Sequence, residues 1–328
     1  MNKIFFRTDF NNIIGFGHYS RCLSIAEITE NKYKVNFVFN KNITTNVDLI
    51  KTNHYSIIFV DDENDFFDLL KPGNIVVVDS YEFNEYVQSE INKKNVKLVV
   101  IDDLNSMVYN CDAIINHGVV YKKEDYNSNT KTRFYLGLDY LMVKKEFRKI
   151  SKLKRNTIIS DNFKSVFICF GGSNQIRLIN ETIKVLIKNK IDIFNILVNE
   201  SLVNEISNEK AQINTFSNLN PSNIIELIRK SDFAILPAST ILLEAFTVGI
   251  PIISGWFVEN QRFSLSEFEK LGLIVNINHF NSEDYQIRLT DAFFLLKNKK
   301  NIIQNQKNKI NLNDQNYLNI FYNLAIDN

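Results

Sequence analysis

The chain has 328 residues, a formal net charge of +1 from 38 basic and 37 acidic side chains, and a hydrophobic content of 45%. This length is about twice that of an ordinary domain, so the sequence predicts two domains with a core each. The near-neutral charge gives no overall attraction for nucleic acid or an anionic membrane, and we expect neither partner. The three cysteines are widely separated, which argues against a disulfide framework or a zinc cluster with short paired spacings.

The amino terminus has no signal-peptide core, because Arg7 and Asp9 interrupt the short apolar run at residues 4–6. No later apolar run approaches the length of a membrane span. We therefore expect a cytoplasmic protein, and we expect it to be a monomer.

The first half of the chain alternates between strand and helix patterns. Strands are predicted at residues 4–6, 35–39, 57–60, 75–78 and 98–101, with helices at 22–30 and 84–92. Continuous apolar strands separated by helices indicate a parallel sheet covered on both faces. Residues 1–150 are thus predicted to form a doubly wound α/β domain.

A glycine-rich turn follows the first predicted strand, with Gly15, Gly17 and His18 in the order Gly-Phe-Gly-His. Glycines let the backbone turn tightly, and a helix N-terminus offers unpaired N–H groups and a partial positive charge. Imidazole has an unperturbed pKa of roughly 6.5, so His18 is a candidate general base. The alternative is that His18 only packs at a helix start.

Carboxylates follow several predicted strands, at Asp61, Asp62, Asp79, Asp102 and Asp103. This is the edge at which open α/β sheets bind ligands. Aspartate is equally suited to turns and helix caps, so both readings stay open for each residue.

Residues 144–155 are basic and irregular and those up to 162 are polar, which predicts an interdomain connector. A second α/β alternation follows, so residues 151–328 are predicted to form the second domain. From residue 289 onward, helical stretches are interrupted by an Asn/Lys-rich segment at 298–313. A final helix could pack back across the interdomain surface, although the composition does not require it.

The second domain carries its own glycine turn, Gly171-Gly172-Ser173, directly after a predicted strand. Such a turn can bring backbone N–H groups close to a phosphate. It matches neither the dinucleotide fingerprint nor the ATPase P-loop, so no nicotinamide, ATP or other cofactor is predicted.

A later strand leads into Ser239 and Thr240, either of which can cap the next helix, and Glu244 lies about one turn inside it. Glu244 could accept hydrogen bonds from ribose hydroxyls, and the amides of Asn260 and Gln261 suit sugar hydroxyls and acetamido groups. The alternative for Glu244 is a surface residue on an ordinary capped helix.

Together these stretches resemble the nucleotide-sugar hydrolases of pseudaminic acid biosynthesis. These UDP-2,4-diacetamido-2,4,6-trideoxy-β-L-altropyranose hydrolases (PseG-type) are related to GT-B glycosyltransferases. The matching stretches are residues 7–9, 15–23, 78–81, 101–104, 111–116, 136–140 with 146–147, 170–173 and 238–261. The chain departs from several relatives at Asn11-Asn12, where they have Ser, and at residues 141–145, where they have a Leu-Leu-Arg stretch.

The resemblance implies a GT-B-like α/β fold, with two Rossmann-like doubly wound domains facing a central cleft. It further implies that the first domain binds the sugar and the second binds UDP. His18 would be the catalytic base, and Asp9, Asp79 or Asp102 would orient it or hold sugar hydroxyls. The residues expected to bind the UDP-sugar are Gly15, Gly17, Arg21, Tyr81, Asp102, Gly171, Gly172, Ser173, Ser239, Thr240, Glu244, Asn260 and Gln261.

The implied reaction is attack of water on the anomeric carbon of a UDP-linked diacetamido-trideoxyhexose, with inversion and release of UDP. Helix N-termini could stabilise the leaving diphosphate, so no metal ion is predicted. Two alternatives stay open, a GT-B glycosyltransferase that passes the sugar to a hydroxyl and a non-catalytic protein that binds nucleotide sugars.

Overall fold

The structure is a computed structural model that describes residues 3–11, 16–44, 55–153, 162–171, 175–206 and 210–326. The chain divides into two compact units, Met1–Lys145 with Leu312–Asn328, and Glu146–Asn311. Each unit contains one sheet, and the described strand pairs are parallel. This confirms the predicted α/β class in both halves of the chain.

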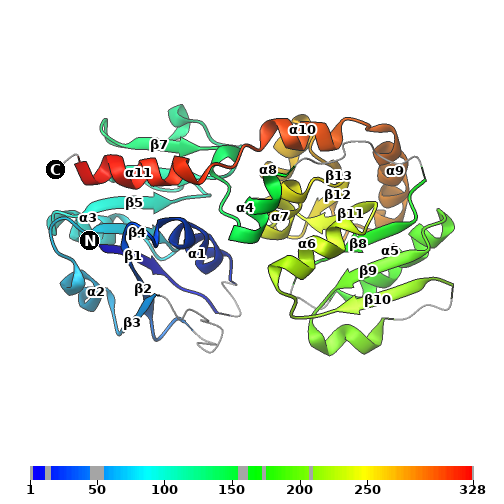
Figure 1. The fold of residues 1–328 in the computed structure, drawn as a ribbon, viewed down its shortest axis with the longest axis horizontal. Coiled ribbons are helices and arrows are strands. Elements are labelled where there is room, and N and C mark those ends of the chain that lie inside the picture. Colours follow the sequence, from blue (N-terminus) through cyan, green and yellow to red (C-terminus); the bar gives the residue numbers. More distant parts are fainter. Residues whose placement is uncertain are drawn as a thin grey trace. The chain divides into compact units, whose positions relative to one another are not determined.

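The first unit is built on a seven-stranded sheet of order β3-β2-β1-β4-β5-β6-β7 (Figure 1). Its strands are β1 (Lys3–Thr8), β2 (Lys34–Asn40), β3 (Ser56–Val60), β4 (Ile75–Asp79), β5 (Lys97–Ile101), β6 (Ala113–Asn116) and β7 (Arg133–Leu136). Its α-helices are α1 (Gly17–Thr29), α2 (Glu63–Leu69), α3 (Glu85–Lys93) and α11 (Asp314–Ile326). The five strands predicted in this half are confirmed, and α1 begins five residues before the predicted start at Cys22.

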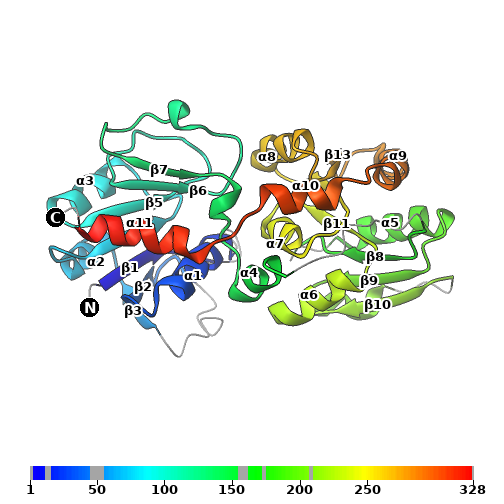
Figure 2. The same cartoon turned by 45° about the horizontal axis from the view of Figure 1, so that its top comes forward.

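The first sheet has a buried apolar cluster on each face, because successive side chains of a strand point to opposite faces. Ile4 and Phe6 of β1 lie in a buried cluster with residues of α1 and α11, whereas Phe5 lies in a cluster with residues of α2 and α3. Figure 2 shows α1 and α11 on the same side of the sheet. The face that a strand residue occupies is therefore fixed by its parity.

The C-terminal helix α11 belongs to the first unit, although the sequence analysis placed residues 312–328 in the second domain. Tyr317, Ile320, Phe321 and Leu324 recur at helical spacing and are buried in the cluster that includes α1. Burial of each such side chain stabilises a fold by roughly 1.5–3 kcal/mol. Burial of the apolar face of α11 therefore explains why the C-terminal segment belongs to the first unit.

The second unit has a six-stranded sheet of order β10-β9-β8-β11-β12-β13. Its strands are β8 (Ser165–Ile168), β9 (Ile193–Leu197), β10 (Gln212–Phe216), β11 (Phe233–Pro237), β12 (Ile252–Trp256) and β13 (Val275–His279). Its α-helices are α4 (Lys145–Ser151, whose first residue belongs to the first unit), α5 (Ile176–Lys188), α6 (Pro221–Arg229), α7 (Thr240–Val248), α8 (Glu259–Lys270), α9 (Tyr285–Asn298) and α10 (Ile302–Lys309).

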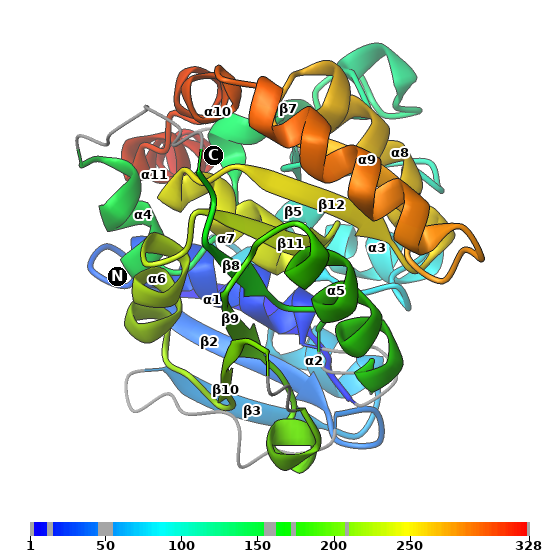
Figure 3. The ribbon, with the colours of Figure 1, turned by 90° about the vertical axis from the view of Figure 1, so that its right-hand side faces the viewer.

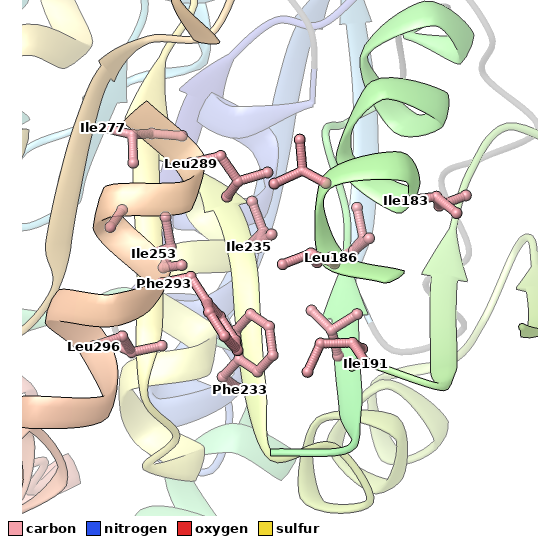
Figure 4. Packing of buried hydrophobic residues seen from close by; sticks show 14 of the residues in the cluster. Ile183, Leu186, Ile191, Phe233, Ile235, Ile253, Ile277, Leu289, Phe293 and Leu296 are labelled. Atoms are coloured by element: carbon pink, nitrogen blue, oxygen red, sulfur yellow. The ribbon is translucent and has the colours of Figure 1, made fainter. Parts of the chain in front are cut away.

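Helices cover both faces of this second sheet. Figure 3 shows α5 and α9 on one side of it and α6 and α7 on the other. The α5/α9 side holds a large apolar cluster, in which Phe233 of β11 packs against Phe293 of α9 with ring centroids 5.5 Å apart. Figure 4 shows Ile235 and Ile253 of the sheet beside Leu289 of α9 in the same cluster.

Two segments are more regular than the sequence indicated. Part of the predicted irregular connector forms α4, whose Phe147 is fully buried. Part of the Asn/Lys-rich interruption forms α10, where Ile302 and Ile303 are buried and Gln306 donates hydrogen bonds to two backbone carbonyls at 2.9 Å. In both cases tertiary packing outweighs a polar composition.

The strand order reverses at one point in each sheet. In the first sheet this point lies between β1 and β4, because β1 leads to α1 on one face and β4 to α3 on the other. In the second sheet it lies between β8 and β11, which lead to α5 and α7 on opposite faces. Ligands of open α/β sheets bind at such points, outside the carboxyl ends of the strands.

Candidate functional site

The first site is built where α1 starts beside the carboxyl end of β4. His18 and Arg21 are three residues apart on α1 and therefore lie on the same face of the helix. Asp79 ends β4 and has the parity of Ile75 and Val77, which face α1. The sequence thus brings an imidazole, a guanidinium and a carboxylate together at the point where the strand order reverses.

The three side chains form a buried hydrogen-bonded cluster. His18 Nδ1 lies 2.5 Å from Oδ1 of Asp79. Arg21 donates two hydrogen bonds to the same carboxylate, from Nη2 to Oδ1 at 2.7 Å and from Nε to Oδ2 at 2.9 Å. Its Nη1 donates a third to Asp103 Oδ2 at 2.8 Å. Arg21, which was expected to contact a ligand, is placed to fix the orientation of Asp79.

The geometry assigns the proton on the His18 ring. Arg21 Nη2 lies 2.9 Å from His18 Nδ1, but an arginine nitrogen can only donate, so a bond here would need an unprotonated Nδ1. That lone pair would then face the carboxylate of Asp79 at 2.5 Å. A proton on Nδ1 removes this repulsion. In the neutral imidazole the lone pair is then on Nε2, where no described residue forms a hydrogen bond.

Burial and charge oppose each other at this cluster. Burial alone would raise the pKa of Asp79, but the charge of Arg21 and the hydrogen bond from His18 outweigh it and hold the pKa of Asp79 below its usual range. Burial alone would lower the pKa of Arg21, yet Asp79 and Asp103 hold it well above its ordinary value. The carboxylate and the guanidinium are therefore both charged at neutral pH.

A small hollow of about 80 Å³ lies beside this cluster and is lined by His18, Asp79, Tyr81 and Asp103 among others. A hollow of this size can hold water molecules, each of which needs about 10–15 Å³ of such space. The Tyr81 ring stands edge-on to the His18 ring with centroids 4.4 Å apart, and its hydroxyl lies 3.4 Å from Asp103 Oδ2. Tyr81, predicted as a binding residue, therefore lies at the imidazole.

The structure does not bring Asp9 to His18. Asp9 accepts hydrogen bonds from Arg7 at 2.6 Å, from the backbone N–H of Asn40 at 2.7 Å and from the Thr44 hydroxyl at 2.9 Å. These hydrogen bonds connect the end of β1 to the loop that follows β2, so Asp9 has a structural role.

Asp102 is likewise engaged within the first unit, on the other face of the sheet from Asp79. It accepts hydrogen bonds from the hydroxyls of Tyr109 and Tyr126 at 2.7 and 2.9 Å, and from the backbone N–H of Asn105 at 3.1 Å. Asp102 also borders the hollow beside His18. Its oxygens are nevertheless occupied in holding the loop after β5.

The second unit places Gly171 and Ser239 beyond the ends of the neighbouring strands β8 and β11, at the reversal point of its sheet. Gly171 has a φ of +87°, a conformation that side chains disfavour. Ser239 is the N-cap of α7 but forms no side-chain capping bond, and no acidic residue lies in the first turn after Thr240. The N–H groups at this helix start are thus suited to an anion.

The other residues predicted in the second unit lie on α7 and α8. Glu244 is buried within α7. Asn260 is exposed in the first turn of α8, and Gln261 accepts a hydrogen bond from the backbone N–H of Phe257 at 3.0 Å. In the first unit, Gly17 is the first residue of α1. Gly15, Gly172 and Ser173 lie outside the described residues.

Two residues at the first site had no assigned role in the sequence prediction: Asp103 was named only as a carboxylate after a strand, and His117 was not named. Strand parity could have found both, because Asp103 follows Val99 and Ile101, and His117 follows Ile115, all on the α1 face. The same parity places Asp102 on the opposite face. No group of three potential metal ligands occurs among the residues that the structure describes, and none of the described helices has the length and hydropathy to cross a bilayer.

Comparison with known proteins gives relatives in sequence and in structure. The chain is 26% identical over 286 residues to an uncharacterized protein of Methanocaldococcus jannaschii, covering 82% of this chain and 58% of that protein. It is 24% identical over 296 residues to UDP-2,4-diacetamido-2,4,6-trideoxy-beta-L-altropyranose hydrolase of Campylobacter jejuni, covering 84% of this chain and all of that protein. No protein-family model matches.

Among solved structures, MurG of Acinetobacter baumannii aligns with 98% of this chain and 100% of its own, at a TM-score of 0.66 and 10% identity. The matching structures are GT-B glycosyltransferases. The fold is GT-B. The expected resemblance to hydrolases of this kind and the expected GT-B fold class are thus confirmed. The two parallel-sheet units described above are the two sheet domains of this fold.

Proposed function

We propose that this GT-B protein hydrolyses a UDP-linked 2,4-diacetamido-2,4,6-trideoxyhexose and releases UDP. The observation that carries the proposal is the His18–Asp79 pair at the reversal point of the first sheet, with Nε2 of His18 left as the acceptor. The likeness to a hydrolase of this substrate in Campylobacter jejuni supports the choice of substrate class. The pathway would be the biosynthesis of a nonulosonic acid of the pseudaminic type.

In the proposed reaction, His18 Nε2 takes a proton from water while the water oxygen bonds to the anomeric carbon. The bond from that carbon to the phosphate oxygen breaks, UDP leaves with the electron pair, and the configuration inverts. Asp79 stabilises the imidazolium that forms, and Arg21 keeps the carboxylate charged and oriented. General-base help of this kind contributes on the order of 10²–10⁴ in rate.

The second unit would bind UDP. Gly171 and the start of α7 at Ser239 and Thr240 would face the diphosphate, because backbone N–H groups and a helix dipole stabilise negative charge without a metal ion. Gly172 and Ser173 are proposed for the same group, Glu244 for the ribose, and Asn260 and Gln261 for the substrate.

A second candidate is a GT-B glycosyltransferase with the same type of donor. It is favoured by the likeness to GT-B glycosyltransferases, which covers nearly the whole chain. The first step would be the same, except that His18 would take its proton from an acceptor hydroxyl.

The deciding experiment incubates the purified protein with the UDP-sugar in ¹⁸O-labelled water without an acceptor. Hydrolysis predicts free sugar with ¹⁸O at the anomeric carbon in amounts equal to UDP, and a roughly 10²–10⁴-fold slower reaction for His18→Ala with unchanged UDP binding. Product that forms only with an added acceptor would favour the transferase. Undiminished turnover in His18→Ala would remove His18 from the mechanism.

A further inference from the structure

A second imidazole lies on the same side of the first sheet as His18. His117 directly follows β6, and Ala113 and Ile115 of that strand belong to the cluster that packs under α1. Ile115 is paired with Ile101 of β5, so His117 and Asp103 occupy corresponding places just beyond two neighbouring strands. The sheet thus holds His117 next to the carboxylate that is bonded to Arg21.

The backbone on both sides of His117 is fixed. Asn116 accepts a hydrogen bond from the N–H of Gly118 at 2.7 Å through Oδ1, and it donates from Nδ2 to the Tyr126 hydroxyl at 2.9 Å. Tyr126 in turn donates to Asp102 at 2.9 Å. The network of Asp102, Tyr126 and Asn116 therefore positions the residue between Asn116 and Gly118.

The ring of His117 is held in its neutral form. Burial lowers the pKa of His117 to about 4, with a further contribution from the charge of Arg21, while Asp103 and Asp79 act in the opposite direction. At neutral pH the imidazole therefore carries one proton and no charge.

The position of that proton follows from the surroundings of the two nitrogens. Nδ1 is closed off from solvent and has no hydrogen-bond partner among the described residues, although the residue as a whole is partly exposed. A buried N–H without an acceptor is rare and costly, and an unused acceptor is tolerated better. The proton consequently resides on Nε2, which makes this nitrogen a donor.

We propose that His117 contacts the sugar and donates a hydrogen bond from Nε2–H to an uncharged oxygen, either a hydroxyl or an acylamino carbonyl. His18 and His117 would then have opposite tautomers, with Nε2 of His18 as the acceptor and Nε2 of His117 as the donor. This assignment rests on the proposed function, because it takes the sugar of that reaction as the ligand. His117 is a binding residue in this scheme and takes no part in proton transfer.

The test compares His117→Ala with His117→Gln, whose side-chain amide can present an N–H donor at a similar distance from the backbone. Glu124→Gln serves as a control because it lies exposed in the same loop segment. His117→Ala should weaken binding of the UDP-linked diacetamido-trideoxyhexose by 10–100-fold in calorimetry, with UDP affinity unchanged. His117→Gln should recover most of the loss, and Glu124→Gln should bind like the wild type.

Three outcomes would overturn this role: wild-type affinity for the UDP-sugar in His117→Ala, a parallel loss of UDP affinity, or a glutamine variant no better than alanine. Thermal unfolding of each variant checks that a loss of binding is not a loss of fold. Every protein in this comparison carries His18→Ala, so the UDP-sugar is not consumed and calorimetry reports binding alone. Failure of hydrolysis in the wild type would then reject the proposed reaction without affecting the binding result for His117.

Discussion

The Nδ1 atom of His18 lies 2.5 Å from Oδ1 of Asp79, across 61 positions of sequence and on two different elements. The contact exists because β1 and β4 are neighbours in the sheet, so that the helix after β1 starts at the end of β4. It fixes one tautomer of the imidazole and leaves Nε2 for chemistry.

Asp79→Asn should slow turnover by roughly 10²–10⁴-fold, because an amide cannot stabilise the imidazolium or hold the tautomer. It should also lower the free energy of unfolding by about 3–5 kcal/mol, since Arg21 loses a buried partner. Asp61→Asn is the control, because Asp61 follows β3 and is exposed. Kinetics and urea unfolding measure both effects, and a fully active Asp79→Asn variant would contradict this role.

Arg21→Lys should reduce turnover and stability together, because one ammonium cannot replace the paired bonds to Asp79 and the bond to Asp103. Arg177→Lys is a matched exchange in an exposed pair with Glu181 and should change stability by less than about 0.5 kcal/mol. The comparison needs kcat, KM and the unfolding midpoint of each variant. Equal changes in kcat, KM and unfolding midpoint in the two variants would contradict a role of Arg21 in orienting Asp79.

Tyr126→Phe tests whether Asp102 holds the loop or the substrate. Removing this hydroxyl should cost about 1–3 kcal/mol of stability, since Asp102 and Asn116 each lose a partner. Sugar affinity should fall only as far as the loop loosens, by less than the loss expected for His117→Ala. A variant with unchanged stability and abolished sugar binding would instead favour direct contact between this network and the ligand.

Mild acid should destabilise the protein through His117. Its pKa is about 4 in the folded chain and roughly 6.5 in an unfolded one. Between these values the unfolded chain binds a proton that the folded chain does not, so this residue makes the free energy of unfolding fall as the pH drops. In urea unfolding, the free energy of unfolding should fall less between pH 7 and pH 5 for His117→Gln than for the wild type. An equal fall in the wild type and in His117→Gln would contradict the lowered pKa of His117.

Gly171→Ala tests the turn at the end of β8. Both Gly171 (φ +87°) and Gly73 (φ +83°) have positive φ, and a Cβ added at either would meet nothing within 4 Å, so both alanine variants carry mainly backbone strain of the order of 1 kcal/mol. Gly73 lies between α2 and β4 in the first unit. Both variants should lose similar stability, but only Gly171→Ala should weaken UDP binding in calorimetry. Equal UDP affinity in the two would argue against a phosphate at Gly171.

Much of the fold was predictable because its signals are local. Apolar β-branched runs such as residues 75–78 gave the strands, and the Gly-Phe-Gly-His stretch placed His18 at a helix start. The helices α4 and α10 were not predicted, because they are stabilised by the burial of Phe147 in α4 and of Ile302 and Ile303 in α10, the latter two in a cluster of residues distant in sequence. Packing of this kind leaves little trace in a polar segment.

The sequence by itself determined that the chain alternates strands and helices twice and that His18 stands at a turn between them, because periodicity and glycine placement act over a few residues. Only the tertiary structure decided which carboxylate meets that imidazole. Asp9 and Asp102 were equal candidates with Asp79, and the order and parity of the strands gave them other partners. Neighbouring strands are set by the burial of both faces of a whole sheet, which no short stretch of sequence contains.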